Sequence, residues 1–337
     1  MILRRLLHFL VPRCWSKTIF LSLIILSLVT PFISNDRPLL MHYNDRFYFP
    51  LWASYTEQDF GEALPIKVDY RDPYLLTKIK QNGWMIRPVI PCGKNAILSH
   101  KGPFPLPPFE SSLLGTDING HDMVAQLLYG FRLALFFGLV VGTLALCIGI
   151  GIGMIQGYIG GITDLLLHRL MEVIACIPML YLIMALSQRY PLNFFSLACA
   201  IIPFKWLLVA RLTRSCVHQE KNKPYILQAQ FLGLSPCRIV IRHLLPNIWP
   251  SLKILWPFLI LGSISTLTTL DFFGLAFPPD VVSLGRLLNE GKNHLHAPWI
   301  ALPPIFLLAL LFGCLILMGQ SKKSMQQILP VEPAGTE

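Results

Sequence analysis

The chain has 337 residues, of which 54% are hydrophobic and only 14% are charged, with a net charge of +10. Soluble domains carry about 25% charged residues, so this composition excludes an ordinary soluble protein. The positive charge does not indicate nucleic-acid binding, because the basic residues lie in short segments beside apolar blocks and form no patch interleaved with aromatic residues. Basic residues in such places set the orientation of membrane proteins.

The first apolar block, Thr18–Ile33, follows the basic residues Arg4, Arg5, Arg13 and Lys17. No small-x-small cleavage site stands near Ser34, so an uncleaved first transmembrane helix is favoured over a signal peptide. The basic residues before it place the N-terminus in the cytoplasm. Residues 1–34 are therefore assigned to a cytoplasmic N-terminus and the first helix.

Residues 35–130 are polar and of mixed charge, and they predict a small folded insertion on the periplasmic side. Prolines crowd its later part and indicate an extended connector; they are Pro88, Pro91, Pro103, Pro105, Pro107 and Pro108. Within residues 120–130, Met123, Leu127 and Leu128 have helical spacing. This spacing predicts a short helix lying in the membrane interface before the next span.

Further spans are predicted at about 131–157, 165–187, 192–213, 246–270 and 298–320, each near the ~20 apolar residues that a bilayer requires. Six helices return the tail, residues 321–337 with Lys322 and Lys323, to the cytoplasm. The loop between the fourth and fifth spans also lies inside, which agrees with its many basic residues and its single acid, Glu220. The predicted fold class is all-α: a polytopic membrane protein with six transmembrane helices and a small periplasmic insertion.

Small residues recur every three or four positions along the second span, at Gly138, Gly142, Ala145, Gly149, Gly153 and Gly157. In a bilayer such a stripe lets helix backbones approach closely. It predicts tight packing, within the subunit or against a partner, with a direct role in the transport path as the alternative. The run is not a nucleotide-binding loop, because it lacks the Lys-Ser/Thr ending and does not follow a strand.

The loop between the fourth and fifth spans, residues 214–246, carries helix start and stop signals. Pro224 suits the first turn of a helix, and Gly233 can adopt the left-handed conformation that ends one. Ser235 can then cap a second helix that begins at Pro236. The sequence thus predicts helix, break and helix in a basic, partly apolar loop, which suits the docking of a partner better than a simple connector.

This segment resembles the EAA loop of binding-protein-dependent ABC permeases, especially those of the dipeptide and oligopeptide group, and it is called the EAA-like loop below. The family pattern reads Tyr-x-Glu-Ala-Ala-x-x-x-Gly-x-Ser and later Arg-His-x-Leu-Pro-Asn. The matching residues are Tyr225, Ala229, Gly233, Ser235, Arg242, His243, Leu245, Pro246 and Asn247. Leu227 stands where the family has Glu, and Gln228 where it has the first Ala. Coupling is therefore expected to rest on helix shape and apolar docking, with any electrostatic share supplied by neighbouring basic residues.

Other segments resemble the same family in the same order. Residues 114–132 are similar to the segment before the second span, with His121 where Arg is usual. Residues 157–164 match the turn after that span, and residues 270–291 resemble the loop before the last span. The early motifs NDRPLL, YFPL, DFG and DYRDPYL look like the far-side insertion of the subgroup of microcin C and oligopeptide permeases.

The resemblance implies a specific set of partners in the inner membrane. These are a second homologous permease subunit, ABC ATPase subunits that bind the EAA-like loop, a periplasmic solute-binding protein and a peptide substrate. This chain would hydrolyse no ATP itself, and no cofactor, metal or catalytic residue is predicted. Two alternatives stay open. One is an importer of the same architecture that moves nickel or glutathione, as related systems do. The other is a channel or a membrane enzyme outside the ABC class.

Three charged residues lie inside predicted spans, where charge is costly and often functional: Glu172, Lys205 and Lys253. At ~1.5 Å of rise per residue, all three are expected at a similar depth. Glu172 is therefore expected to pair with Lys205 or Lys253. The alternative is that Glu172 pairs with Arg169 on its own helix while the lysines reach toward the interface. His294, His296, Glu290 and Asp280 are interpreted as loop residues at the outer rim.

Overall fold

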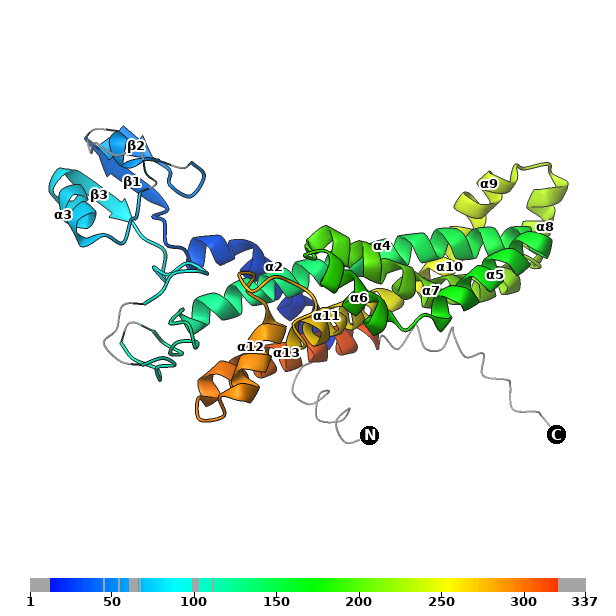
Figure 1. The fold of residues 1–337 in the computed structure, drawn as a ribbon. Coiled ribbons are helices and arrows are strands. Elements are labelled where there is room, and N and C mark those ends of the chain that lie inside the picture. The colour runs from blue at the N-terminus through cyan, green and yellow to red at the C-terminus, as the bar shows by residue number, and fades with distance from the viewer. Residues whose placement is uncertain are drawn as a thin grey trace. The chain divides into compact units, whose positions relative to one another are not determined.

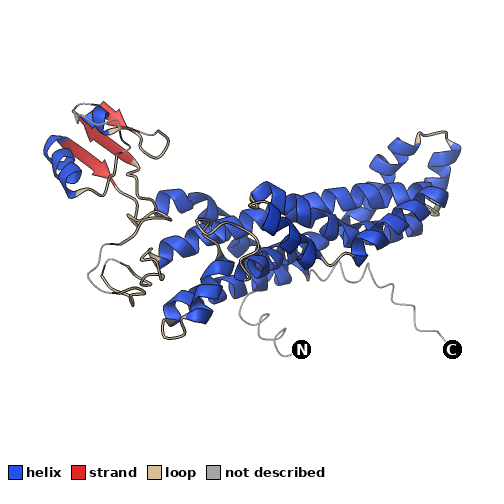
Figure 2. Ribbon diagram, in the orientation of Figure 1, coloured by secondary structure: helices blue, strands red, loops and turns tan. Residues whose placement is uncertain are grey.

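The computed structural model describes residues 13–320, except 45, 54, 61–65, 67, 99–102 and 111. The basic residues Arg4 and Arg5 and the tail with Lys322 and Lys323 lie outside the described residues. Most of the described chain is helical, with one small sheet (Figures 1 and 2).

The helical elements of the described chain are α2 (Arg13–Ile33), η1 (Glu57–Phe60), α3 (Pro73–Asn82), α4 (Met123–Ile159), α5 (Gly161–Cys176), α6 (Met179–Arg189), α7 (Phe194–Glu220), α8 (Pro224–Phe231), α9 (Pro236–Ile239), η2 (Val240–Leu244), α10 (Leu245–Leu252), α11 (Leu255–Phe272), α12 (Leu284–Asn293) and α13 (Pro298–Gly319). The strands are β1 (Leu40–Tyr43), β2 (Arg46–Tyr48) and β3 (Gly83–Ile86).

Five of these helices, α2, α4, α7, α11 and α13, are long and apolar enough to cross a membrane, and the bent pair α5–α6 makes a sixth candidate. The predicted class, a polytopic helical membrane protein, is confirmed. The third span differs from the prediction because α5 and α6 meet at an angle of 68°. Pro178 disfavours a helical conformation in the residue before it, and Ile177 is accordingly extended, with φ −78° and ψ 119°.

The interfacial helix expected over 120–130 is not a separate element. Instead α4 runs unbroken through this segment for 37 residues. Asp122 starts it, because the Oδ1 atom of its side chain accepts the backbone N–H of Ala125 at 2.9 Å, an N-terminal cap. Gly130 does not end the helix, and a Cβ there would lie 3.1 Å from the backbone of Ser283 and Leu284. Glycine at this position therefore allows the backbone at Ser283 and Leu284 to pack closely against α4.

The chain divides into two compact units. The first comprises Met1–Ser22, Ala134–Val281 and Phe306–Glu337, and the second comprises Leu23–Leu133 and Val282–Ile305. The first unit holds most of the span residues and the EAA-like loop. One buried cluster in it joins α4, α7 and the loop, and it includes Leu146, Val209, Ile226, Ile239, Leu244 and Ile248.

The second unit contains a three-stranded antiparallel sheet in the order β2-β1-β3, which the sequence did not reveal. Met41 of β1 pairs with Tyr48 on one side and with Met85 on the other. Met41 and Tyr43 point to one face of the sheet and pack with Phe60 and Ile79 in a small core. The insertion is therefore a folded α/β module within an otherwise helical chain.

Candidate functional site

The EAA-like loop adopts the predicted helix, break and helix. Helix α8 ends at Phe231, and Gly233 follows with φ +73°. The N–H of Gly233 donates to the carbonyl of Gln230 at 2.9 Å, and the N–H of Leu234 donates to that of Ala229 at 3.2 Å. This pair of bonds is the Schellman arrangement, which needs a left-handed residue where glycine is favoured. The break is thus fixed by backbone geometry.

Two predicted details of the loop differ in the structure. Ser235 occupies the N-cap position of α9, but its side chain makes no capping hydrogen bond. Pro246 does not begin a new helix after a break. Helical structure continues from α9 through the π-helical turn η2 into α10, where the N–H of Leu245 reaches the carbonyl of Val240. A proline ring clashes with the carbonyl four residues earlier, and a wider π-helical turn before Pro246 relieves that clash.

Hydrogen bonds tie the loop to the helices on either side. The Tyr225 hydroxyl donates to Oε2 of Glu220 at 2.7 Å, and Nδ2 of Asn247 donates to the same hydroxyl at 2.9 Å. Lys223 pairs with the other carboxylate oxygen of Glu220 at 2.6 Å. Burial, and then the bond to Glu220, raises the pKa of Tyr225 above its usual value. Tyr225 therefore links the end of α7, the start of α8 and α10 through one hydroxyl.

The loop has a buried side and an exposed apolar side. Ile226 and Ala229 of α8 pack into the core, together with Ile239 and Leu244. On the outside, Phe231 and Leu232 are 89% and 81% exposed, and the other exposed apolar side chains are Leu227 and Ile241. Leu227, which replaces the family's acid, thus belongs to this surface. Arg242 is also exposed, whereas His243 is half-buried and its carbonyl accepts from Asn247.

An ion pair that the sequence did not predict joins α5 to α7 beside this loop. Nε and Nη2 of Arg214 donate to the two carboxylate oxygens of Asp164 at 2.6 and 2.5 Å. Lys221 at the end of α7 donates to the carbonyl of Gly157 at 3.1 Å. Because 50 residues separate Asp164 from Arg214, no local spacing could have paired them. The two contacts hold the end of α4 and the first turn of α5 against the helix that enters the loop.

The glycine stripe of α4 packs inside the subunit against two different helices. A Cβ at Gly138 or Gly142 would meet Ile264 or Ile260 of α11 at 2.5 to 3.2 Å. Farther along α4, a Cβ at Gly149, Gly153 or Gly157 would meet residues of α7 at 2.5 to 3.1 Å. The α7 residues concerned are Trp206, Val209, Ala210, Thr213, Arg214 and Val217. The stripe thus allows α4 to approach two neighbouring helices.

The cross-helix pairing expected for Glu172 is wrong in this structure. Glu172 pairs on its own helix with Arg169 at 2.7 Å and approaches His168 at 3.5 Å. Arg169 is only three positions from Glu172, so the two can pair without bringing the carboxylate across to another helix.

Lys205 donates instead to the Gly262 carbonyl at 3.0 Å and to Oγ1 of Thr266 at 2.9 Å. Lys205 therefore joins α7 to α11 and does not reach toward the interface, and Lys253 lies at the end of α10.

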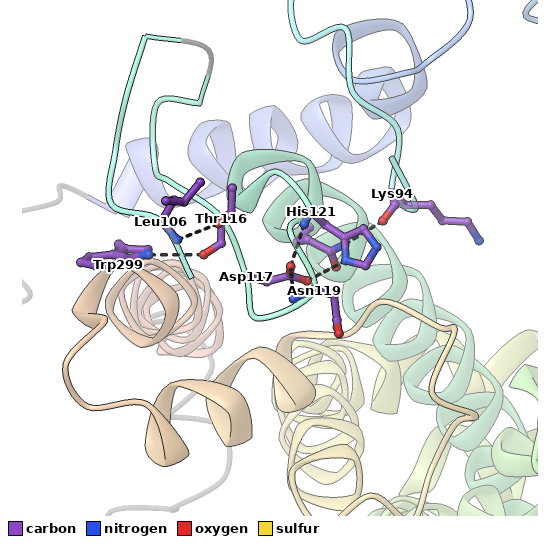
Figure 3. Close-up of polar contacts among 8 residues, drawn as sticks. Lys94, Leu106, Thr116, Asp117, Asn119, His121 and Trp299 are labelled. Carbon is purple, nitrogen blue, oxygen red and sulfur yellow. Dashed lines mark hydrogen bonds and ion pairs between the residues drawn. The ribbon is translucent and has the colours of Figure 1, made fainter. Parts of the chain in front are cut away.

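A second polar cluster surrounds His121 in the second unit (Figure 3). Nδ1 of His121 lies 2.8 Å from Oδ2 of Asp117, whose Oδ1 accepts the backbone N–H of Asn119 and of His121. The indole N–H of Trp299 donates to the carbonyl of Thr116 at 3.3 Å. The hydrogen bond to Asp117 raises the pKa of His121. The carboxylate of Asp117 thus favours the protonated form of His121.

Glu290 lies near this cluster on α12, and not in a loop as predicted. Its Oε2 atom is buried without a hydrogen-bond partner among the described residues. Burial, and to a smaller extent the charge of Asp117, raise the pKa of Glu290, whereas Arg286 and His121 lower it, and the net value is about 7. His294 and His296 lie nearby in sequence, with ring centroids 5.5 Å apart. Among the described residues no group of three or more metal-binding side chains converges.

This raised pKa predicts a pH dependence. Between its ordinary value of 4.5 and about 7, Glu290 holds a proton in the folded chain only, so stability falls as pH rises through this range. The free energy of unfolding falls by about 3 kcal/mol at most over this pH range. Glu290→Gln is expected to remove this pH dependence. The variant should therefore be more stable than the parent at pH 8 and about as stable as the parent at pH 5. Thermal unfolding of the detergent-purified chain across pH measures this.

The matched control for that measurement is Glu110→Gln, which alters an exposed carboxylate in the same unit. It should leave the pH profile unchanged. A Glu290→Gln variant with the same slope of melting temperature against pH as the parent would exclude this role for Glu290.

Together, the spans and the ordered loop with its exposed apolar side define a polytopic membrane protein. Residues 149–321 match the family of binding-protein-dependent transport system inner membrane components. The chain belongs to this family and is an inner-membrane, multi-pass permease subunit of an ABC importer.

Two known permease proteins are similar in sequence to this chain over most of its length. The chain is 40% identical to the inner membrane ABC transporter permease protein YejE of Escherichia coli K12, over 91% of this chain and 90% of the relative. It is 34% identical to the peptidoglycan transport system permease protein YejE of Agrobacterium fabrum, over 91% and 87%. The oligopeptide transport system permease protein OppC of Haemophilus influenzae is 30% identical over 61% of this chain and 66% of the relative.

Proposed function

We propose that this chain imports peptides or peptide-like compounds across the inner membrane, as one of two homologous permease subunits. ATPase subunits that bind the EAA-like loop would supply the energy, and a periplasmic binding protein would deliver the substrate. The substrate class is supported by relatives whose names specify oligopeptide and peptidoglycan transport. In this arrangement the N-terminus, the C-terminal tail and the EAA-like loop lie on the cytoplasmic side.

The observation that carries the proposal is the exposed apolar side of the EAA-like loop. Phe231 and Leu232 sit at the Schellman turn and are almost fully exposed. Leaving such side chains in water sacrifices the free energy that their burial would release, about 1.5–3 kcal/mol each. A partner with an apolar groove would recover it. An ATPase subunit that binds here needs no acid at position 227, since Leu227 itself contributes apolar surface.

Coupling then follows from how the loop is held. When ATP binding draws the ATPase subunits together, a docked α8 moves with them. Tyr225 transmits the displacement, because its hydroxyl bonds both to Glu220 at the end of α7 and to Asn247 of α10. Lys205 extends the same connection by joining α7 to α11. The loop and these three helices would therefore move together when the permease opens.

Phe231→Ser tests the docking surface. Because Phe231 is 89% exposed, its loss should leave the fold intact while weakening ATPase binding. Burial of a phenylalanine contributes about 1.5–3 kcal/mol, so the dissociation constant should rise about 10- to 100-fold. Binding of the purified ATPase subunit to the permease pair in nanodiscs measures this, and ATP-driven peptide uptake by proteoliposomes should fall in parallel.

The control is Phe195→Ser at the start of α7, where the side chain is 75% exposed but lies outside the EAA-like loop. It should bind the ATPase like the parent. If both variants bind the ATPase equally well, the loop does not dock it through apolar contacts.

A further inference from the structure

An exposed aromatic cluster lies where the insertion leaves the first span. It consists of Phe32, in the last turn of α2, and of Phe49 and Trp52 from the loop after β2. The ring of Trp52 lies 6.0 Å from that of Phe32 and 6.2 Å from that of Phe49, measured between centroids. All three side chains are exposed, and Trp52 is 71% exposed.

The cluster continues an apolar stripe along α2. Ile25, Leu28, Val29 and Phe32 are all exposed, and their spacing of three and four residues places them on one face of the helix. Residues Trp15–Ile33 are long and apolar enough to cross the bilayer, so this face suits contact with lipid chains. The stripe ends at Phe32, one residue before α2 ends. Trp52 therefore lies beside the end of this apolar stripe.

The loop that carries Trp52 is ordered by its own hydrogen bonds. The N–H groups of Trp52 and Ala53 both donate to the carbonyl of Phe49, at 3.1 and 3.0 Å. Nη1 of Arg37 donates to the Pro50 carbonyl at 3.3 Å. These bonds hold a tight turn with the indole outside, so little conformational entropy is lost when the indole meets a surface.

We propose that residues Phe49–Ala53 form an interfacial anchor that seats the insertion on the bilayer, on the side where α2 ends. Tryptophan is enriched at this depth because its large ring is apolar while its N–H can bond to headgroups or water. In this arrangement the Trp52 ring lies at the boundary between headgroups and acyl chains, next to Phe32. The anchor restricts how the small sheet and α3 can tilt above the membrane.

The chain offers an internal comparison. Trp84 of β3 is also exposed, at 46%, but it stacks on His42 with centroids 6.0 Å apart and planes 13° apart. Phe47 completes that second group of rings on the sheet. No contact that the structure describes joins Trp84 to α2, so the proposal assigns it to water.

Fluorescence quenching by brominated lipids tests the anchor. The assembled transporter is placed in nanodiscs whose lipids carry bromine close to the headgroup, and the emission of the parent is compared with that of Trp52→Phe and Trp84→Phe. Both changes keep an aromatic ring at the site. Trp52→Phe is expected to remove emission that shallow bromine quenches, whereas Trp84→Phe should remove only unquenched emission.

Two results would overturn the proposal. One is an equal quenched component in the parent and in Trp52→Phe. The other is quenching of Trp52 in the isolated chain that disappears on assembly, which would assign the aromatic cluster to an interface with another subunit. Persistence of Trp52 quenching in both preparations supports the lipid contact.

Discussion

Gly233→Pro is expected to abolish coupling between the permease and its ATPase. The native residue has φ +73°, whereas proline fixes φ near −65° and has no N–H. The substitution therefore removes the bond from Gly233 to the Gln230 carbonyl and redirects α9 relative to α8. We expect transporters with this variant to lose ATP-driven peptide uptake and the stimulation of ATPase activity by the loaded binding protein.

The informative control is Gly233→Asn. Asparagine tolerates the left-handed conformation better than other residues with a side chain, and a Cβ at this position meets nothing within 4 Å. It should retain most of the coupling. Normal uptake with the proline variant would show that the shape of the loop does not carry the coupling.

Gly153→Leu is expected to lower the stability of the packed transmembrane helices. In Gly153→Leu the new Cβ would lie 2.5 Å from the Ala210 carbonyl oxygen and 2.6 Å from Cβ of Thr213. A backbone oxygen in a packed helix cannot move aside, so α4 and α7 must separate. Overpacking of this kind costs about 3 kcal/mol at the upper end of its usual range. We expect a marked fall in the temperature at which the detergent-purified chain aggregates.

Gly151→Leu provides the matched control on the same helix. A Cβ at Gly151 meets nothing within 4 Å, so a leucine there faces open space. Its thermal stability should equal that of the parent. If the two leucine variants are destabilised equally, the close approach of α4 and α7 does not determine the effect.

Local signals in the sequence predicted much of the EAA-like loop. Pro224 and Gly233 act through the backbone of their own turn, so the ends of α8 follow from residue type. The apolar runs likewise predicted the spans, because bilayer thickness sets their length. The continuation of α9 into α10 was missed, because a π-helical turn before Pro246 can absorb the proline without ending the helix.

The missed contacts join residues far apart in the chain. Lys205 and Thr266 are separated by 61 residues, and their contact depends on how α7 packs against α11. The expected pairing of Glu172 with a lysine assumed that equal depth implies contact, although depth does not determine which face of a helix a residue occupies. The sheet was missed because β1, β2 and β3 have only three or four residues each, too few for a clear alternation.

The most direct measurement of the central claim is photo-cross-linking from position 231 in the assembled transporter. A photoreactive phenylalanine analogue replaces Phe231, and the same analogue at position 195 serves as the control. We predict an adduct between position 231 and the ATPase subunit, and none between position 195 and that subunit. Adducts from position 231 only with lipid or with permease subunits would contradict the assignment of the EAA-like loop as the ATPase docking site.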